Sequence, residues 1–408
     1  MSTRADVIII GGGPSGVAAA VELRRQGVAR VVLLEREPHL GGATRHCSHS
    51  PFGMREFGRV YLGAAYGRRL AREAEAAGVE LRLGHSVTQI GADGEIAVTS
   101  AHGIEMLSAR RVLIATGARE MPRSARLISG DRPLGVVTTG TLQSYVAFHG
   151  LMPFQRPLIV GSELVSLSAV FTCLTHGARP VAMIESAPAP LARAPFSWFP
   201  ALVGVPFHRG AEIVDIRGVR RVEEVSFRRA DSGVETVACD GVLLTGRFVP
   251  ESALCRQSEV GVDAGSGGPA IDQDGRCANP LFFASGNVLR AVETGGWAFR
   301  EGRAVGRTIA RDLARDTPAR AAVPVGFDPP VKLAVPSLLR RPLDGPPAFP
   351  DFQLRFTRHA TGRLTLELDG RAVWEKRGDW RPERRILVPI PSAAFDAEQI
   401  HFRFREGE

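Results

Sequence analysis

The most regular feature of the chain is a set of short apolar runs, each followed by a glycine-containing turn. Residues 7–10 (VIII) are continuously apolar, which is typical of a parallel strand buried on both faces. After the turn, residues 18–25 have helical patterning and residues 31–34 form a second apolar run. This order of strand, turn, helix and strand predicts an α/β fold of the Rossmann type.

The same order recurs in the second half of the chain. Residues 158–160 predict a strand, 164–174 a helix and 181–184 the next strand, and short strands follow in both halves. An equal stretch of chain separates Gly11 from Glu35 and Gly161 from Glu185. We therefore predict two Rossmann-like dinucleotide-binding domains, one inserted in the other. Their expected bounds are 1–121 plus 247–318 for the first domain and 122–246 for the second.

The last part of the chain, 325–408, has a different pattern. A proline-rich connector leads into alternating apolar and polar residues, which predicts a small C-terminal β-rich appendage. "LTLELDGRAVWEK" predicts a hairpin that turns at Asp369-Gly370, and "RRILVPI" and "IHFRFRE" predict further strands. The appendage is expected either to contact a partner protein or to cover the core. Trp374 and Trp380 are candidates either for a partner contact or for core packing.

Composition and charge narrow the range of functions. The 408 residues carry a formal net charge of +8, almost wholly from scattered arginines, and this lack of clustering argues against nucleic-acid binding. The five cysteines form no C-x-x-C pair, which excludes a disulfide framework and a zinc ribbon. They favour a reducing compartment, so we expect a cytoplasmic protein. We identify no signal-peptide pattern and no apolar run near the ~20 residues that span a bilayer.

The first turn has the chemistry of a dinucleotide-binding site. Gly11 permits the tight turn, Gly13 lets the backbone approach a pyrophosphate, and Gly16 lets helix and strand pack closely. The helix N-terminus offers N–H groups and a positive dipole end to the anion. Glu35, at the end of the next strand, can accept hydrogen bonds from a ribose.

The second turn, "PLIVGSELVSLSAV", has the pattern without these glycines. Glu163 and Ser166 stand at the third and sixth positions, where the first turn has Gly13 and Gly16. A carboxylate at Glu163 would repel a pyrophosphate, and Ser166 adds a side chain where close packing favours none. We therefore predict a second domain that keeps its fold without the nucleotide, although nicotinamide binding by another route stays open.

A reactive sequence follows Gly41-Gly42. In "ATRHCSHSPFG" a single cysteine, Cys47, lies between His46 and His49, so a dithiol relay is excluded at this position. Cys47 could act as a thiolate, and His46 or His49 could exchange protons near neutral pH. The run could also be a packed loop or bind a metal, but no further ligand cluster accompanies it, and we expect no metal site.

These runs together resemble the two-dinucleotide-domain flavoproteins of the pyridine nucleotide–disulfide oxidoreductase superfamily. The motifs that carry the resemblance are the first turn, Gly41-Gly42, "RVLIATGARE" and "LFFASGNV". It implies FAD at the first turn and a contact of Gly286-Asn287 with the ribityl chain, with Asn287 in place of the family's aspartate. It also implies that a helix starting near Gly296 points its N-terminus at the flavin. The residues expected to bind FAD are Gly11, Gly13, Pro14, Ser15, Gly16, Glu35, Arg36, Gly42, Ala43, Val87, Ala115, Thr116, Gly117, Gly286, Asn287, Gly296 and Trp297.

Four stretches are similar to a narrower subgroup: "GGATRHCSHSPFG", "IATGAREMPR", "RPLGVVTTGTLQ" and "GNVLRAVETGGWAFREGR". The subgroup comprises FAD subunits of opine oxidases, of proline and hydroxyproline dehydrogenases and of hydrogen cyanide synthase. It also includes FAD proteins encoded beside glycerol-3-phosphate dehydrogenase-like flavoproteins. The resemblance implies an FAD-dependent oxidoreductase subunit of a multi-subunit dehydrogenase or oxidase. Its substrate would be a small amine, amino acid or hydroxy compound.

The resemblance also implies the partners. These are one or more flavoprotein subunits, together with a small-molecule substrate or electron acceptor, with no nucleic acid and no integral membrane segment. Two alternatives stay open at this point. One is an NAD(P)H-dependent flavin reductase, and the other is a non-catalytic scaffold subunit that holds FAD.

Overall fold

The main sheet of the first domain is parallel. Most of its strands precede the second domain in the chain, and one strand follows it. The computed structural model describes residues 4–47, 51–229, 233–315, 321–341, 345–382 and 384–407. The strand order is β3-β2-β1-β6-β17. The strands are β1 (Ala5–Ile10), β2 (Val31–Glu35), β3 (Glu80–Leu83), β6 (Gly103–Ile114) and β17 (Phe282–Ala284). Strands β1 and β2 are buried almost throughout, as their continuous apolar runs predict.

Strand β6 joins two sheets. The sequence predicts separate strands near Ile104 and at 112–115, but the structure has one strand. Its second half pairs with β1 in parallel, and its first half pairs antiparallel with β5 (Glu95–Ser100), which in turn pairs with β4 (Ser86–Ile90). The helix α1 (Pro14–Arg25) packs against both α3 (Gly63–Ala76) and α8 (Gly295–Arg315). The short helices of this part are α2 (Met54–Phe57), α7 (Ala253–Arg256), η1 (Gly42–His46), η2 (Ser124–Arg126) and η4 (Gly286–Val288).

The second sheet repeats this architecture. Its order, β11-β10-β9-β15-β8, is parallel throughout, and β12-β13-β14 form an antiparallel sheet beside it. The strands are β8 (Val136–Thr138), β9 (Pro157–Val160), β10 (Ala182–Glu185), β11 (Phe207–Arg209), β12 (Ala211–Arg217), β13 (Glu224–Arg229), β14 (Gly233–Ala238) and β15 (Gly241–Leu244). The helices are α4 (Thr139–His149), α5 (Leu164–Thr175), η3 (Phe196–Trp198) and α6 (Phe199–Leu202).

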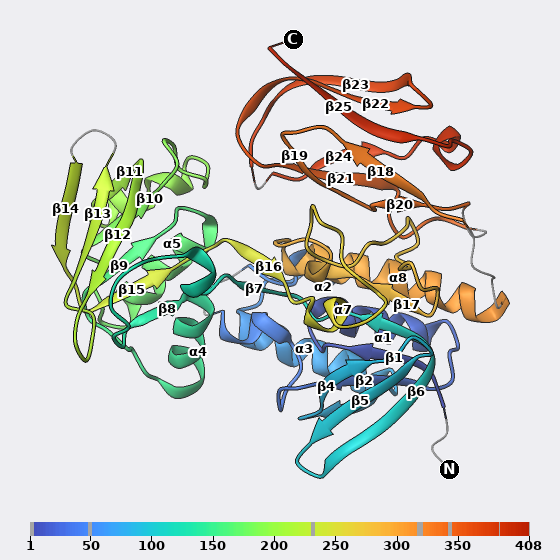
Figure 1. Cartoon of the computed structure of the whole chain (residues 1–408). Helices are drawn as coiled ribbons and strands as arrows, with labels where there is room; N and C mark the ends of the chain where they lie inside the picture. The colour runs from blue at the N-terminus through green and yellow to red at the C-terminus, as the bar shows by residue number, and fades with distance from the viewer. Residues whose placement is uncertain are drawn as a thin grey trace.

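A two-stranded ribbon connects the two halves (Figure 1). The chain leaves the first domain along β7 (Ala118–Glu120) and returns along the antiparallel strand β16 (Phe248–Pro250). The expected fold class, with one Rossmann-like domain inserted in the other, is therefore confirmed.

The C-terminal region forms two facing sheets, drawn in red above α8 in Figure 1. Their orders are β20-β18-β25-β22-β23 and β19-β21-β24. The strands are β18 (Val323–Phe327), β19 (Val331–Val335), β20 (Leu338–Leu339), β21 (Asp351–Phe356), β22 (Ala360–Leu368), β23 (Arg371–Trp380), β24 (Ile386–Pro389) and β25 (Ile400–Glu406), with the turn η5 (Ser392–Phe395). The predicted hairpin turn at Asp369-Gly370 is confirmed, and both residues have positive φ.

The C-terminal sandwich is firmly joined to the first domain. Leu333, Val335 and Phe349 belong to the first domain's hydrophobic core, and Arg340 forms a buried ion pair with Asp272 at 2.8 Å. Trp380 is a core residue of the sandwich, stacked on a phenylalanine ring. Within the described part of the chain, no helix is both long enough and apolar enough to cross a membrane.

Candidate functional site

The first glycine turn forms an open cradle at the end of β1. A β-carbon at Gly16 would lie 1.9 Å from the carbonyl oxygen of Gly11, so only glycine lets α1 pack this closely on the turn. A β-carbon at Gly13 would meet nothing within 4 Å. The first turn of α1 carries no acidic residue. The cradle therefore fits the pyrophosphate of a dinucleotide such as FAD, because space and a positive helix end coincide there.

Glu35 is held by backbone donors at the end of β2. Its buried carboxylate accepts hydrogen bonds from the N–H groups of Gly12 at 2.8 Å and Glu37 at 2.9 Å. Its backbone carbonyl accepts from the N–H of His85 at 3.0 Å, which fixes the start of β4 and therefore the position of Val87. Arg36 follows at the surface. The structure thus places Glu35, the acid expected to contact a ribose, next to the glycine turn.

Segments far apart in the chain meet around this cradle. An added β-carbon at Gly42 would lie 3.1 Å from Cα of Gly13, and one at Gly11 would lie 2.5 Å from the carbonyl oxygen of Ala115. On the other side, the hydroxyl groups of Ser15 and Ser285 are 2.7 Å apart. The additional residues expected at the cofactor that lie in these segments are Pro14, Ala43, Thr116, Gly117 and Gly286.

Asn287 and the start of α8 form the far end of the candidate site. The side-chain amide of Asn287 donates to the carbonyl of Glu293 at 3.1 Å and accepts from its N–H at 2.8 Å. These bonds close the loop that leads into α8. Gly296 and Trp297 lie in the first turn of that helix, as expected.

His46 ends η1 and Cys47 follows it, and both residues face the second domain. The ring of His46 is 6.4 Å from that of Phe148, and Sγ of Cys47 is 3.9 Å from Oε1 of Gln143, both on α4. Burial raises the pKa of the Cys47 thiol to about 11, which favours the protonated thiol over the thiolate at neutral pH. His49 lies outside the described residues. Within the described residues, no group of three or more metal-binding side chains comes together.

Alkylation of Cys47 is expected to be slow at pH 7 and to accelerate about tenfold per pH unit up to pH ~11, because only the thiolate reacts. Mass spectrometry of protein treated with iodoacetamide at several pH values measures this rate. Unfolded protein is the control, since its thiol should titrate near the ordinary pKa. A rate that is already maximal at pH 7 would mean that Cys47 is a thiolate.

The second turn contains its own carboxylate in place of an open cradle. A β-carbon at Gly246 would lie only 2.0 Å from Oε1 of Glu163, which shows how closely this carboxylate lies against the end of β15. The other oxygen, Oε2, accepts from the hydroxyl groups of Ser166 at 3.0 Å and Thr245 at 3.4 Å. Glu163 therefore brings negative charge and bulk to the N-terminus of α5.

The rest of the second turn keeps the arrangement of the first. Glu185 accepts hydrogen bonds from the hydroxyl group of Ser162 at 2.5 Å and from the N–H of Ala187 at 2.9 Å. Gly12 and Glu37 provide the equivalent donors to Glu35. The second domain thus keeps its acid, Glu185, at the end of β10. The two turns differ at Glu163, where the first turn has Gly13.

The sequence singled out neither Glu120, which joins the two domains, nor Arg126, which joins two segments of the second domain. Glu120 accepts from the N–H groups of Gly140 at 2.8 Å and Gly246 at 3.1 Å, and burial raises the pKa of its carboxyl group. Arg126 donates to the carbonyls of Thr245 and Gly246, each at 2.9 Å. No local pattern identifies them, because these contacts to Thr245 and Gly246 span more than a hundred residues.

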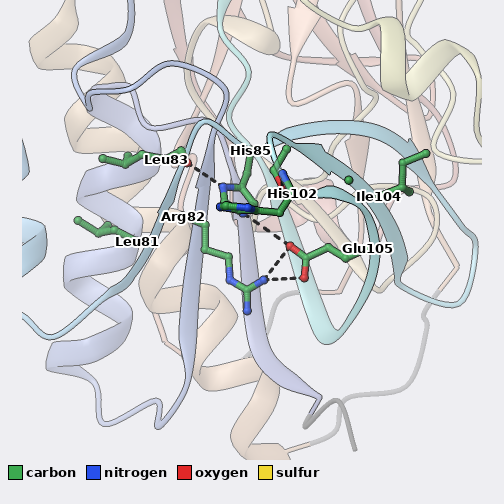
Figure 2. Close-up of a pocket in the computed structure, with 9 residues that line it drawn as sticks. Leu81, Arg82, Leu83, His85, His102, Ile104 and Glu105 are labelled. Carbon is green, nitrogen blue, oxygen red and sulfur yellow. Dashed lines mark hydrogen bonds and ion pairs between the residues drawn. The ribbon is translucent and has the colours of Figure 1, made fainter.

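A hollow of about 630 Å³ lies elsewhere, beside β3 and the β5–β6 hairpin (Figure 2). In Figure 2, Arg82 and His85 point toward Glu105, at 3.0 and 3.7 Å. The charge of Arg82 is matched by the carboxylates of Glu80 and Glu105, so we assign no chemistry to this hollow.

Comparison with known proteins gives a consistent assignment. A family model described as pyridine nucleotide-disulphide oxidoreductase matches residues 5–302. The chain is 31% identical over 186 residues to an opine oxidase subunit of Rhizobium meliloti strain 1021, covering 45% of this chain and 39% of that protein. It is 28% identical over 284 residues to a hydrogen cyanide synthase subunit of Pseudomonas aeruginosa, covering 61% and 58%. Thioredoxin reductase of T. acidophilum superposes with a TM-score of 0.63 at 20% identity, covering 76% of this chain and 98% of that one.

Both curated relatives extend beyond the matched region. The chain spans between about two fifths and three fifths of their length. The structural match at 20% identity supports the fold.

Proposed function

Because this chain belongs to the pyridine nucleotide-disulphide oxidoreductase family and is an FAD-dependent oxidoreductase, we propose that it is the FAD-binding subunit of a multi-subunit dehydrogenase or oxidase. Its substrate would be a small amine, amino acid or hydroxy compound. Relatives that are named as subunits of opine oxidase and hydrogen cyanide synthase support this proposal. We also propose a cytoplasmic location, which the five unpaired cysteines support.

The observation that carries the proposal is the difference between the two turns. The first turn is open above Gly13, whereas the carboxylate of Glu163 occupies the corresponding region of the second. A pyrophosphate would meet a like charge there in partly buried surroundings. The chain would therefore take its electrons from a partner flavoprotein or from the substrate rather than from NAD(P)H.

We propose that FAD is held by the residues that converge on the first turn. Bound FAD supplies the electron-transfer chemistry, which amino-acid side chains lack. Gly13 and the N-terminus of α1 would receive the pyrophosphate, and Glu35 the ribose. Asn287 would orient the loop that leads into α8.

We expect the FAD-reconstituted chain to keep its oxidised flavin spectrum when mixed anaerobically with NADH or NADPH. Stopped-flow absorbance measures the flavin spectrum after mixing. The double variant Glu163→Gly with Ser166→Gly should gain nicotinamide binding. Glu163→Gln, which removes only the charge, is the matched variant. Rapid loss of flavin absorbance in the unchanged chain would instead assign an NAD(P)H-dependent flavin reductase.

A second experiment tests whether the chain works with a partner protein, and it uses the complex purified from the native host. The proposal predicts that flavin absorbance decreases when an amine, amino acid or hydroxy substrate is added to the complex. A complex that needs this chain for assembly, but whose FAD no substrate reduces, would identify a scaffold subunit.

A further inference from the structure

The strand β21 of the C-terminal sandwich carries polar side chains on a buried face. Phe352, Leu354 and Phe356 point into the sandwich core, so the alternation of the strand places Gln353 and Arg355 on the opposite face. Both are almost fully buried, at 6% and 2% exposure. Polar residues at two successive positions of such a face require partners, and the partners lie in the first domain.

Arg355 binds the loop that joins η4 to α8. Its guanidinium donates to the carbonyls of Ala291 at 2.5 Å and Val292 at 2.8 Å, and to Oε1 of Glu293 at 2.7 Å. One side chain of the sandwich thus holds three consecutive residues of the loop. Gln353, two positions earlier, donates to Glu301 of α8 at 3.2 Å.

Arg385 reaches the same loop from the start of β24. It donates to Oε2 of Glu293 at 2.9 Å, so that each carboxylate oxygen of Glu293 accepts from a different arginine of the sandwich. Its guanidinium also lies 3.6 Å from the ring centroid of Trp297, in the first turn of α8. Arg385 therefore connects the loop to the helix that follows it.

These side chains form a compact group of charges, here called the Glu293 cluster. It consists of Arg290, Glu293, Glu301, Arg355 and Arg385. Arg290 is fully buried and pairs with Glu301. Three guanidinium groups face two carboxylates in this cluster, and a third carboxylate, that of Glu56, lies against Gly296 at the N-terminus of α8. The helix dipole contributes positive potential at the same helix end.

The loop that the cluster holds also carries Asn287. The backbone of Glu293 makes both hydrogen bonds to the Asn287 amide, and its carboxylate is the centre of the cluster. The same residue therefore joins the proposed cofactor contact to the sandwich. Because Arg355 binds the backbone on the N-terminal side of Glu293, the loop cannot shift without breaking contacts to the sandwich.

We propose that Arg355 and Arg385 are positioning residues through which the C-terminal sandwich orders the flavin end of the FAD site. The sandwich is then part of the cofactor site, in addition to any contact with a partner protein. The inference rests on the proposed placement of FAD beside Asn287 and the N-terminus of α8. The cation of Arg385, which lies on Trp297 in the first turn of α8, would favour the flavin when it has taken up electrons.

The test measures FAD affinity and the flavin midpoint potential in the full-length chain. We expect Arg355→Met to raise the Kd for FAD by about tenfold or more, the loss expected for a charged hydrogen bond. Arg385→Met should raise the Kd and also make the midpoint potential more negative, because it removes a cation. Arg385→Lys keeps the charge and should restore the potential more fully than the affinity, because it loses the flat contact with Trp297.

The control is Arg363→Met, which removes an exposed ion pair with Glu375 on the same sandwich. It should change neither the Kd nor the potential. Arg355→Met leaves Glu293 with only one arginine of the sandwich and could destabilise the protein, so thermal unfolding is recorded for each variant. Arg385 is partly exposed, so its substitution is expected to disturb the fold less.

Unchanged Kd and potential in both Arg355→Met and Arg385→Met would overturn the inference. If Gly13→Ala weakens FAD binding while these two variants do not, the proposed FAD placement stands and only the role of the sandwich is wrong. If Gly13→Ala also has no effect, the placement of FAD fails together with it.

Discussion

Replacing Gly13 with alanine is expected to weaken FAD binding by roughly 100-fold while the cofactor-free protein stays folded. The φ of Gly13 is −76°, which any residue adopts, and an added β-carbon would meet no protein atom within 4 Å. The methyl group would instead occupy the space where the backbone approaches the pyrophosphate. Fluorescence titration with FAD measures the Kd, and thermal unfolding of cofactor-free protein measures the fold.

The matched comparison for this prediction is Gly16→Ala. Its β-carbon would lie 1.9 Å from the carbonyl oxygen of Gly11, so this substitution should destabilise the protein whether or not FAD is present. Equal FAD affinity in Gly13→Ala and the unchanged chain would contradict the proposed pyrophosphate position.

The second large effect is expected at Asp312. This fully buried carboxylate of α8 pairs with Arg111 of β6 and with Arg276, which lies before β17. Asp312→Ala leaves two buried guanidinium groups without their shared anion, and breaking a buried pair in this way costs about 3–5 kcal/mol. Urea unfolding monitored by circular dichroism gives the free energy of unfolding.

A surface carboxylate serves as the control. Glu375 pairs with Arg363 at 3.3 Å, and both side chains are about half exposed. Glu375→Gln should therefore change the free energy of unfolding by less than about 1 kcal/mol. A similarly small change for Asp312→Ala would show that the buried pair makes no large contribution to stability.

The sequence allowed most of the fold to be predicted. The apolar runs, the helix expected to start near Gly296 and the hairpin turn at Asp369-Gly370 are local patterns, and each is found in the structure. The repeat predicted a second Rossmann-like domain, and the main sheet of that domain is parallel. The exception is β6, where the sequence predicted two strands and the structure has one. Strand β6 stays continuous although its pairing partner changes from β5 to β1. This continuity depends on the neighbouring strands, which local periodicity does not reveal.

The candidate site was only partly predictable. The glycines of the first turn and Glu35 follow from spacing, and the structure brings them together. The protonation state of Cys47 does not follow from its flanking histidines, because burial raises its pKa. Arg355 and Arg385 gave no signal near a motif. For Arg355, the sequence offers one cue, a polar residue at alternate positions of an otherwise apolar strand.

The sequence by itself determined the two Rossmann-like domains, the open first turn and the altered second turn, because turn chemistry and apolar periodicity act over a few residues. Only the tertiary structure decided where the carboxylate of Glu163 lies and that the C-terminal sandwich holds the loop before α8. Arg355 and Arg385 are 62 and 92 positions away from Glu293, and such contacts are set by the packing of whole domains. In the folded protein, the altered turn holds the carboxylate of Glu163 against Gly246 and the hydroxyl group of Ser166.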